Sequence, residues 1–284
     1  MKILVLGASG MIGHTMFRVL ATAYRRVWGT IRNPADRTYF SDSFSEQLLL
    51  VDDLARPDVL TQLFEQIKPE VVINCVGLTK HRRESNNSQL SIAINSLLPH
   101  RLSDCCAAAD ARLIHVSTDC VFSGLKGNYS ERDVPDALDI YGKSKYLGEV
   151  SYPHTVTLRT STIGHELHST HGLLEWFLCQ HGHCKGFSRA IFSGLPTIVF
   201  SQVVRDFVLS RRELTGLYHV SATPINKLEL LRLIAKLYGK KIDLIPDDSF
   251  VIDRSLNGSR FSYETGYVAP DWEEMISLMH AGKV

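Results

Sequence analysis

Short hydrophobic runs alternate with amphipathic segments along the first 160 residues of the chain. Each run holds five to seven mostly apolar residues, which predicts parallel strands buried on both faces. The segments between the runs repeat apolar residues every three or four positions, which predicts helices. The predicted strands are 2–6, 27–31, 47–51, 70–76, 112–117 and 155–159, and the clearest helices are 11–23, 57–67 and 88–109.

This alternation predicts an α/β fold, a Rossmann-like doubly wound parallel sheet with right-handed crossovers. The pattern weakens after residue 164, where His, Gly and Ser are frequent. A single hydrophobic core seldom grows far beyond the size of this 284-residue chain, so we expect a second, smaller C-terminal α/β lobe. A helix at 201–210 and a strand at 217–220 are expected to return to the main sheet. The predicted main domain is 1–165 with 198–222, and the predicted lobe is 166–197 with 223–284, the latter holding a helix, a strand at 241–245 and a helix containing Trp272.

The composition is that of an ordinary globular protein, with 44% hydrophobic and 21% charged residues and a formal net charge of +1. No strongly basic surface is predicted, so we expect no nucleic-acid partner. The short basic patch Lys80–Arg83 is interpreted as a solvated loop, with contact to substrate phosphates as the alternative.

The six cysteines show no Cys-x-x-Cys pair and no regular spacing, so they predict reduced thiols rather than a disulfide framework or a zinc ribbon. The apolar stretch 3–6 is too short for a signal-peptide core. No hydrophobic run approaches the length of a membrane span. We therefore expect a cytoplasmic protein without a membrane partner.

A glycine-rich segment follows the first predicted strand directly and opens the first predicted helix, which is the context that a dinucleotide fingerprint requires. Gly7 permits a tight turn, Gly10 lets the backbone approach a pyrophosphate, and Gly13 lets the helix pack on the strand. The helix N-terminus supplies unpaired N–H groups for the anion. A strand-to-helix turn without a cofactor also favours glycine, but the position in an alternating chain favours an NAD(P) site. The predicted contacts are Gly7, Ser9, Gly10, Met11, Ile12 and Gly13.

The second predicted strand lacks the acidic residue that would bind the ribose 2′-hydroxyl in an NAD-preferring site. Thr30 and Arg32 are instead expected to meet a 2′-phosphate, which predicts NADPH, with NADH as the alternative cofactor. The other interpretation of Arg32 is a plain loop arginine. Asp53 and Leu54 follow the third strand and are expected to hold the adenine, with helix N-capping as the alternative for Asp52 or Asp53.

Tyr141 and Lys145 lie four residues apart, so on a helix they share one face. A fixed cation favours the ionised form of a neighbouring phenol, so we expect Lys145 to lower the pKa of Tyr141 and to bind the nicotinamide ribose. Many helices contain such a pair by chance. Its combination with the glycine segment predicts acid–base catalysis.

Hydroxyl side chains end the fifth predicted strand at the sheet edge where open α/β sheets bind ligands. Thr118 is expected to hydrogen-bond a substrate carbonyl oxygen beside Tyr141, and Ser117 to contact the cofactor. The alternative is that these hydroxyls only satisfy turn backbone.

These residues resemble the extended short-chain dehydrogenase/reductase family, and most closely its dTDP-4-dehydrorhamnose reductase branch. The branch signature Ser-Thr-Asp-aromatic-Val-Phe is seen at 117–122, with Cys120 in place of the aromatic residue. The resemblance covers most of the chain and is sharper in the first 160 residues. Further similar residues are Asn74, Cys75, Val76 and Gly77, of which the last three are implied to line the cofactor, then Asn95, Arg159 and the stretch 253–257.

The resemblance implies a hydride passed from NADPH to C4 of a nucleotide-linked 4-keto-6-deoxysugar, in deoxysugar or surface-polysaccharide synthesis. Tyr141 would give the proton, Lys145 would tune it, and Thr118 would polarise the ketone. The smaller lobe would bind the nucleotide sugar, and a homodimer is expected. One alternative is an epimerase or dehydratase that keeps its cofactor bound. Another is a non-catalytic regulatory subunit that binds NADP.

Histidines recur at 165, 168, 171, 181 and 183, which raises a metal hypothesis. Their spacing matches no standard zinc pattern, so we predict no metal and interpret 165–183 as a solvated or substrate-facing segment. Trp176 and Phe177 are interpreted as core residues, with nucleotide contact as the alternative.

Overall fold

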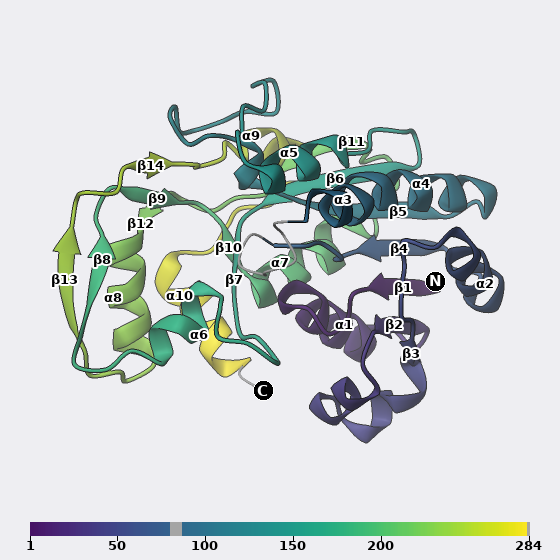
Figure 1. The fold of residues 1–284 in the computed structure, drawn as a ribbon, viewed down its shortest axis with the longest axis horizontal. Coiled ribbons are helices and arrows are strands. Elements are labelled where there is room, and N and C mark those ends of the chain that lie inside the picture. Colours follow the sequence, from purple (N-terminus) through teal and green to yellow (C-terminus); the bar gives the residue numbers. More distant parts are fainter. Residues whose placement is uncertain (80–86, 283–284) are drawn as a thin grey trace.

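The computed structural model describes residues 1–79 and 87–282, so the basic patch Lys80–Arg83 lies outside the described residues. A parallel sheet of seven strands forms the centre of the molecule, in the order β11-β6-β5-β4-β1-β2-β3 (Figure 1). The strand order reverses between β1 and β4, the switch point where such sheets bind ligands. The strands are β1 Ile3–Leu6, β2 Val27–Ile31, β3 Leu48–Leu50, β4 Val71–Asn74, β5 Arg112–Thr118, β6 Thr155–Thr160 and β11 Gly216–His219.

Helices cover both faces of this sheet, and the predicted fold class is confirmed. On one face, Phe17 of α1 and Phe200 of α7 lie in one hydrophobic cluster with Ile3 of β1. On the other face, Leu63 of α2 and Leu102 of α4 pack with alternate strand residues. The helices around the sheet are α1 Met11–Ala23, α2 Pro57–Ile67, α3 Ser88–Ser91, α4 Leu98–Ala108, α5 Ile140–Leu147, α7 Thr197–Val203 and α9 Ser259–Thr265.

Two helical runs contain a wider π-helical turn. The segment predicted as a helix over 88–109 is continuous, with a π turn at Ile92–Leu97 between α3 and α4. The helix predicted at 201–210 begins four residues earlier, because α7 starts at Thr197 and continues as a π turn at Val204–Val208. π turns occur often at functional sites.

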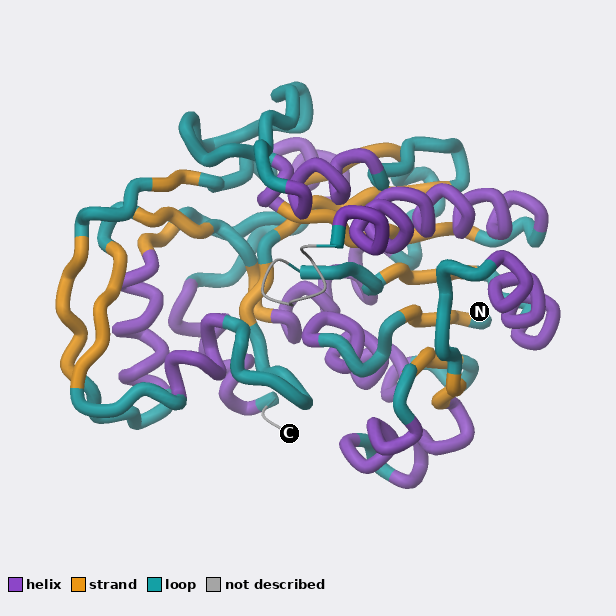
Figure 2. The backbone as a smooth tube through the Cα atoms, in the orientation of Figure 1, coloured by secondary structure: helices purple, strands orange, loops and turns teal. Residues whose placement is uncertain are grey.

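The remaining elements form a smaller layered lobe at one end of the main sheet (Figure 2). β8 pairs with β13 in parallel, and β9 lies between β12 and β14. Leu174, Phe177, Leu230 and Ile276 are buried together between these strands and helices. The elements are β7 Thr162–Ile163, α6 Leu173–Leu178, β8 His183–Phe187, β9 Ala190–Phe192, β10 Leu195–Pro196, β12 Ile225–Asn226, α8 Lys227–Leu237, β13 Asp243–Asp247, β14 Ile252–Asp253 and α10 Trp272–Ala281.

The chain crosses between the two parts more than once. Strand β11 pairs with β6 at the edge of the main sheet, and Phe261 of α9 and Met275 of α10 pack into the main core. The predicted strand at 241–245 is present as β13, shifted by two residues. The boundaries predicted for the two domains stay a prediction.

Candidate active site

The glycine segment forms the tight turn between β1 and α1. Gly7 has φ +80°, a conformation that side chains rarely adopt. A Cβ atom at Gly13 would lie 1.9 Å from the Gly7 carbonyl oxygen, so only glycine lets α1 pack this closely on the turn. Gly10 is the N-cap residue of α1, and no side chain accepts a hydrogen bond from the first turn of the helix. The first N–H groups of α1 are therefore available to an anion. This cradle fits a pyrophosphate.

Thr30 and Arg32 have different surroundings. The Thr30 side chain is buried, and its hydroxyl accepts a hydrogen bond from Gly7 N at 3.0 Å. Thr30 therefore supports the glycine turn from below, a role that the sequence did not indicate. Arg32 is exposed just after β2 and makes no hydrogen bond or ion pair with the described part of the chain. Its guanidinium is available for a phosphate.

The loop after β3 contradicts the N-cap interpretation of Asp52 and Asp53. Helix α2 begins at Pro57 with Arg56 as its N-cap residue, so neither Asp52 nor Asp53 caps it. Asp53 is exposed, and its carboxylate accepts a hydrogen bond from Ala55 N at 2.9 Å. Leu54 is buried beneath this turn. The predicted contact of both residues with adenine stays a prediction.

The loop after β4, which carries Cys75, Val76 and Gly77, lies against the glycine turn. A Cβ atom at Gly7 would lie 3.1 Å from the Val76 side chain. Burial raises the pKa of the Cys75 thiol to about 12, so this thiol stays protonated. The three residues therefore lie between the glycine turn and Lys145, since a Cβ atom at Gly77 would lie 4.0 Å from Lys145 Nζ.

Helix α5 presents Tyr141 and Lys145 on one face. Asp139 begins the helix, because its carboxylate accepts a hydrogen bond from Gly142 N at 2.8 Å. Lys145 is buried, and its ammonium donates a hydrogen bond to the Val116 carbonyl oxygen at 2.8 Å. The position of Lys145 is thus fixed against strand β5.

The structure corrects the predicted effect of Lys145 on Tyr141. Burial raises the pKa of the Tyr141 phenol, and the hydrogen bond with Thr118 only partly opposes this effect. Three acidic neighbours, Cys120, Asp119 and Asp139, raise its pKa further. Our expectation of a lowered pKa was wrong, because burial of the phenol has the largest effect on its pKa and the acidic neighbours add to it. The phenol therefore keeps its proton.

Lys145 responds to burial in the opposite sense. Removing its ammonium from water lowers the Lys145 pKa to about 8, while Glu149 and Cys75 act to raise it. Thr118 is the last residue of β5 and lies next to Tyr141, and its hydroxyl accepts a hydrogen bond from Cys120 N at 3.1 Å. The structure thus brings Thr118, Tyr141 and Lys145 to the carboxyl end of β5.

A buried ionic network lies beneath this end of β5, and the sequence pattern did not reveal it. Glu149 accepts two hydrogen bonds from Arg159, at 2.7 and 2.6 Å, and a third from the Ser117 hydroxyl at 2.6 Å. The side chains of Arg159 and Glu149 are only 2% and 8% exposed. Arg159 also contacts His219 at 3.2 Å. Ser117 lines the cavity described below and is anchored by this network.

A cavity of about 470 Å³ lies between the main sheet and the smaller lobe. Thr118, Tyr141, Met11 and Ile12 line one side of it. The lobe contributes aromatic and basic side chains to the other side, where Trp176, Phe187 and Phe250 are each more than a third exposed. Phe177 is fully buried, so the core interpretation is right for Phe177 and wrong for Trp176. The basic residues that line this side are Lys185, Lys227 and Arg254.

The lobe side of this cavity could not be found from the sequence, because its residues come from α6, β8, α8 and the stretch before β14. Two signals pointed to it: the nucleotide contact considered as the alternative for Trp176, and the resemblance of the stretch 253–257 to the family. Within it, Arg254 donates a hydrogen bond to the Phe122 carbonyl oxygen at 2.8 Å and approaches Cys120 Sγ at 3.7 Å. The signature around Cys120 and the stretch 253–257 are therefore in contact.

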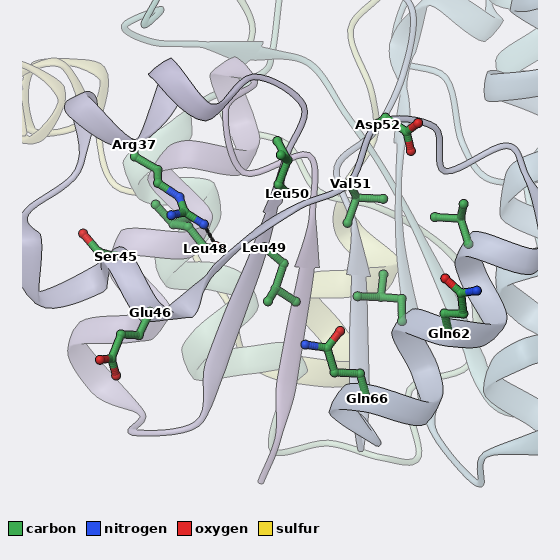
Figure 3. Close-up of a pocket in the computed structure, with 12 residues that line it drawn as sticks. Arg37, Ser45, Glu46, Leu48, Leu49, Leu50, Val51, Asp52, Gln62 and Gln66 are labelled. Atoms are coloured by element: carbon green, nitrogen blue, oxygen red, sulfur yellow. Dashed lines mark hydrogen bonds between the residues drawn. The ribbon is translucent and has the colours of Figure 1, made fainter.

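A second hollow of about 590 Å³ lies beside the edge strand β3, away from these residues (Figure 3). Leu49 and Leu50 of the strand and Gln62 and Gln66 of α2 line it. Arg37 closes one end by donating a hydrogen bond to the Leu48 carbonyl oxygen at 2.9 Å. None of the predicted site residues lines this hollow.

The histidines of 165–183 do not gather around one point. His165 bonds Glu175 at 2.6 Å and the Tyr238 hydroxyl at 3.0 Å, whereas His168 faces Asp36 at 3.3 Å. Across residues 1–79 and 87–282, no group of three His, Cys, Asp or Glu residues could hold a metal ion. Over the same ranges, no helix has the length and apolar character needed to cross a membrane.

Comparison with known proteins gives a family match. The model of the family described as RmlD substrate binding domain matches residues 1–184. The chain is 24% identical over 237 residues to a dTDP-4-dehydrorhamnose reductase of Aggregatibacter actinomycetemcomitans, covering 78% of this chain and 74% of that protein. A reductase of the same name from Burkholderia thailandensis is 30% identical over 168 residues, which cover 57% of this chain and 50% of that protein.

One solved structure and one further relative extend this comparison. The crystal structure of the Bacillus anthracis dTDP-4-dehydrorhamnose reductase in complex with NADP has a TM-score of 0.79 and 20% identity, covering 99% of this chain and 98% of that one. The methionine adenosyltransferase 2 subunit beta of Xenopus laevis is 28% identical over 148 residues, which cover 52% of this chain and 41% of that protein. Most of these sequence matches span about half the length of the relatives.

Proposed function

This chain belongs to the RmlD substrate binding domain family, the RmlD branch of the extended short-chain dehydrogenases/reductases, and we propose that it reduces a nucleotide-linked 4-keto-6-deoxysugar with NADPH. One observation supports the proposal most directly. Thr118 and Tyr141 face the same cavity as Met11 and Ile12, the first residues of the helix that follows the glycine turn. A ketone and a dinucleotide bound there would lie side by side.

NADPH bound at the glycine turn would supply the hydride. The Tyr141 hydroxyl then donates its proton to the oxygen of the reduced carbonyl, a role that suits a phenol whose pKa is raised by burial. Thr118 donates a hydrogen bond to the same oxygen. The Lys145 ammonium, held by the Val116 carbonyl, supplies positive charge when Tyr141 has given up its proton.

The preference for NADPH follows from Arg32. This guanidinium is exposed just after β2, makes no hydrogen bond or ion pair with the described part of the chain, and follows a strand that ends without an acidic residue. Replacing Arg32 by alanine should weaken the binding of NADPH much more than the binding of NADH. Equal weakening of both cofactors would contradict this assignment.

The smaller lobe supplies the chemistry that a nucleotide sugar needs. Trp176, Phe187 and Phe250 present aromatic surface to the cavity, and Lys185 and Arg254 add positive charge for a diphosphate. Phe187 and Phe250 are already in contact, with ring centroids 5.2 Å apart.

The decisive experiment follows NADPH oxidation with 4-keto-6-deoxysugars linked to dTDP, UDP and GDP. The wild type should turn over at least one of them, whereas Tyr141→Phe should lose at least about 100-fold in kcat and still bind NADPH. An exposed tyrosine on the same helix, Tyr146, gives the matched control Tyr146→Phe, which should remain active. A fully active Tyr141→Phe variant would refute the proposed acid.

The alternatives make different predictions in the same assay. An epimerase or dehydratase that retains its cofactor would convert the sugar without net NADPH oxidation. A regulatory subunit would bind NADPH and oxidise none, in the wild type and in Tyr141→Phe alike. The relative named as a subunit of methionine adenosyltransferase keeps this second alternative open to test.

A homodimer and a cytoplasmic location stay predictions. Leu97, Tyr146 and Leu147 are each more than 40% exposed at the start of α4 and on α5, and they offer apolar surface to a second copy. Light scattering during size-exclusion chromatography would measure the mass in solution.

A further inference from the structure

Residues 164–172 join β7 to α6, and we call them the strap. The strap projects from the smaller lobe toward α1 (Figure 1). Near its middle, His168 Nε2 lies 3.3 Å from Asp36 Oδ1, in the short helix Pro34–Tyr39 that follows β2. The His168 ring also meets the edge of the Tyr39 ring, with centroids 4.8 Å apart. The strap therefore contacts the segment that comes directly after Arg32.

The far end of the strap lies at the phosphate cradle. A Cβ atom at Gly172 would lie 3.6 Å from Met11 Sδ, and Met11 is the first residue of α1. Gly172 and Met11 both line the cavity between the sheet and the lobe. The strap thus runs from the place proposed for the pyrophosphate to the place proposed for the 2′-phosphate.

The strap is a closed loop with its own internal bonds. The Glu166 carboxylate accepts hydrogen bonds from Gly172 N at 2.6 Å and from the Ser169 hydroxyl at 2.9 Å. His165, at its base, is fixed to the lobe through Glu175 and Tyr238. These bonds link the residues of the strap to one another, and the His168–Asp36 contact joins the strap to the segment after β2.

We propose that the strap closes over the adenosine and pyrophosphate half of the bound dinucleotide, and that the His168–Asp36 contact slows its release. The inference rests on the proposed function in one respect, because it takes the ligand of the glycine turn to be NADPH. The side chain of Asp36 is only 8% exposed and that of His168 is 39% exposed, so loss of the contact would free the histidine to swing outward and leave the carboxylate in place.

The test measures the dissociation rate of NADPH from the full chain by stopped-flow fluorescence, with excess NADP⁺ as the displacing ligand. His168→Ala should release NADPH about two to five times faster than the wild type, the effect of one partly exposed polar contact. His168→Glu places a carboxylate opposite Asp36 and should release it faster still. Adding Asp36→Asn to His168→Glu removes the repulsion and should restore much of the slower rate.

The same strap offers a matched control. His171 is exposed, and no hydrogen bond or ion pair links it to the described residues, so His171→Ala and His171→Glu should release NADPH at the wild-type rate. Release at equal rates from wild type, His168→Ala and His168→Glu would overturn the role of the strap while leaving the proposed reductase intact. Failure of the wild type to bind NADPH would overturn both. If the wild type reduces none of the sugars but the variants still release NADPH at different rates, only the proposed substrate would be overturned.

Discussion

The Asn95 side chain donates a hydrogen bond to the Ser144 hydroxyl at 3.1 Å, which ties the π turn before α4 to the helix that carries Tyr141 and Lys145. The same side chain accepts a hydrogen bond from Leu78 N at 2.8 Å and donates one to the Leu78 carbonyl at 3.1 Å. The buried amide of Asn95 therefore fixes the position of the loop after β4 relative to helix α5.

Replacing Asn95 by alanine should lower both stability and turnover. The change leaves buried backbone groups of Leu78 without partners, which costs about 1–3 kcal/mol of unfolding free energy. We expect kcat to fall more than the affinity for NADPH, because α5 loses its support. Asn95→Asp keeps the acceptor for Leu78 N, so its stability and kcat should lie between those of the wild type and of Asn95→Ala. Urea unfolding and steady-state kinetics would measure these effects, and wild-type values for Asn95→Ala would refute them.

The Glu149–Arg159 pair should contribute far more to stability than an exposed pair. Arg159→Leu leaves the Glu149 carboxylate buried without its cation, so we expect a loss of about 3–5 kcal/mol in urea unfolding. The control is Arg232→Leu, because Arg232 and Glu229 are each nearly half exposed. This variant should lose at most about 1 kcal/mol of unfolding free energy. Similar losses in the two variants would contradict the importance of burial.

Gly13 and Gly10 should respond differently to alanine. At Gly13 a Cβ atom would meet backbone at 1.9 Å, so Gly13→Ala should lower the unfolding free energy by at least about 1–3 kcal/mol. At Gly10 the nearest atom, Gly7 O, would be 3.4 Å away, so Gly10→Ala should fold normally yet bind NADPH more weakly. Thermal unfolding and fluorescence titration separate the two effects, and unchanged NADPH affinity in Gly10→Ala would count against the cradle.

Stability should rise with pH on account of Lys145. Burial lowers the Lys145 pKa from 10.5 to about 8, so between these values the unfolded chain binds more protons than the folded one. The free energy of unfolding therefore increases with pH across this window. Lys145→Met lacks this contribution, so wild type should gain stability relative to it from pH 8 to pH 10. Urea unfolding at each pH would show this, with Lys143→Met, an exposed lysine on the same helix, as control. Parallel curves for wild type and Lys145→Met would contradict it.

Much of the fold could be predicted from the sequence because its signals are local. Apolar runs and the 3.6-residue period depend on near neighbours, so the order of strands and helices, the glycine turn and the shared face of Tyr141 and Lys145 followed from spacing alone. The turn between β1 and α1 is the clearest case, since Gly7 is required by its positive φ and Gly13 by its close approach to the Gly7 carbonyl six residues earlier.

Contacts between distant segments were decided by the tertiary structure. The Thr30 hydroxyl supports Gly7 because β2 lies beside β1, and Glu149 receives Ser117 and Arg159 because β5 and β6 are neighbours. The raised pKa of Tyr141 comes from burial, which no local pattern encodes. The sequence alone determined which side chains could perform proton transfer. Only the tertiary structure decided their protonation, their supports within the main sheet and the aromatic side of the cavity formed by the smaller lobe, because those depend on residues brought together across the whole chain.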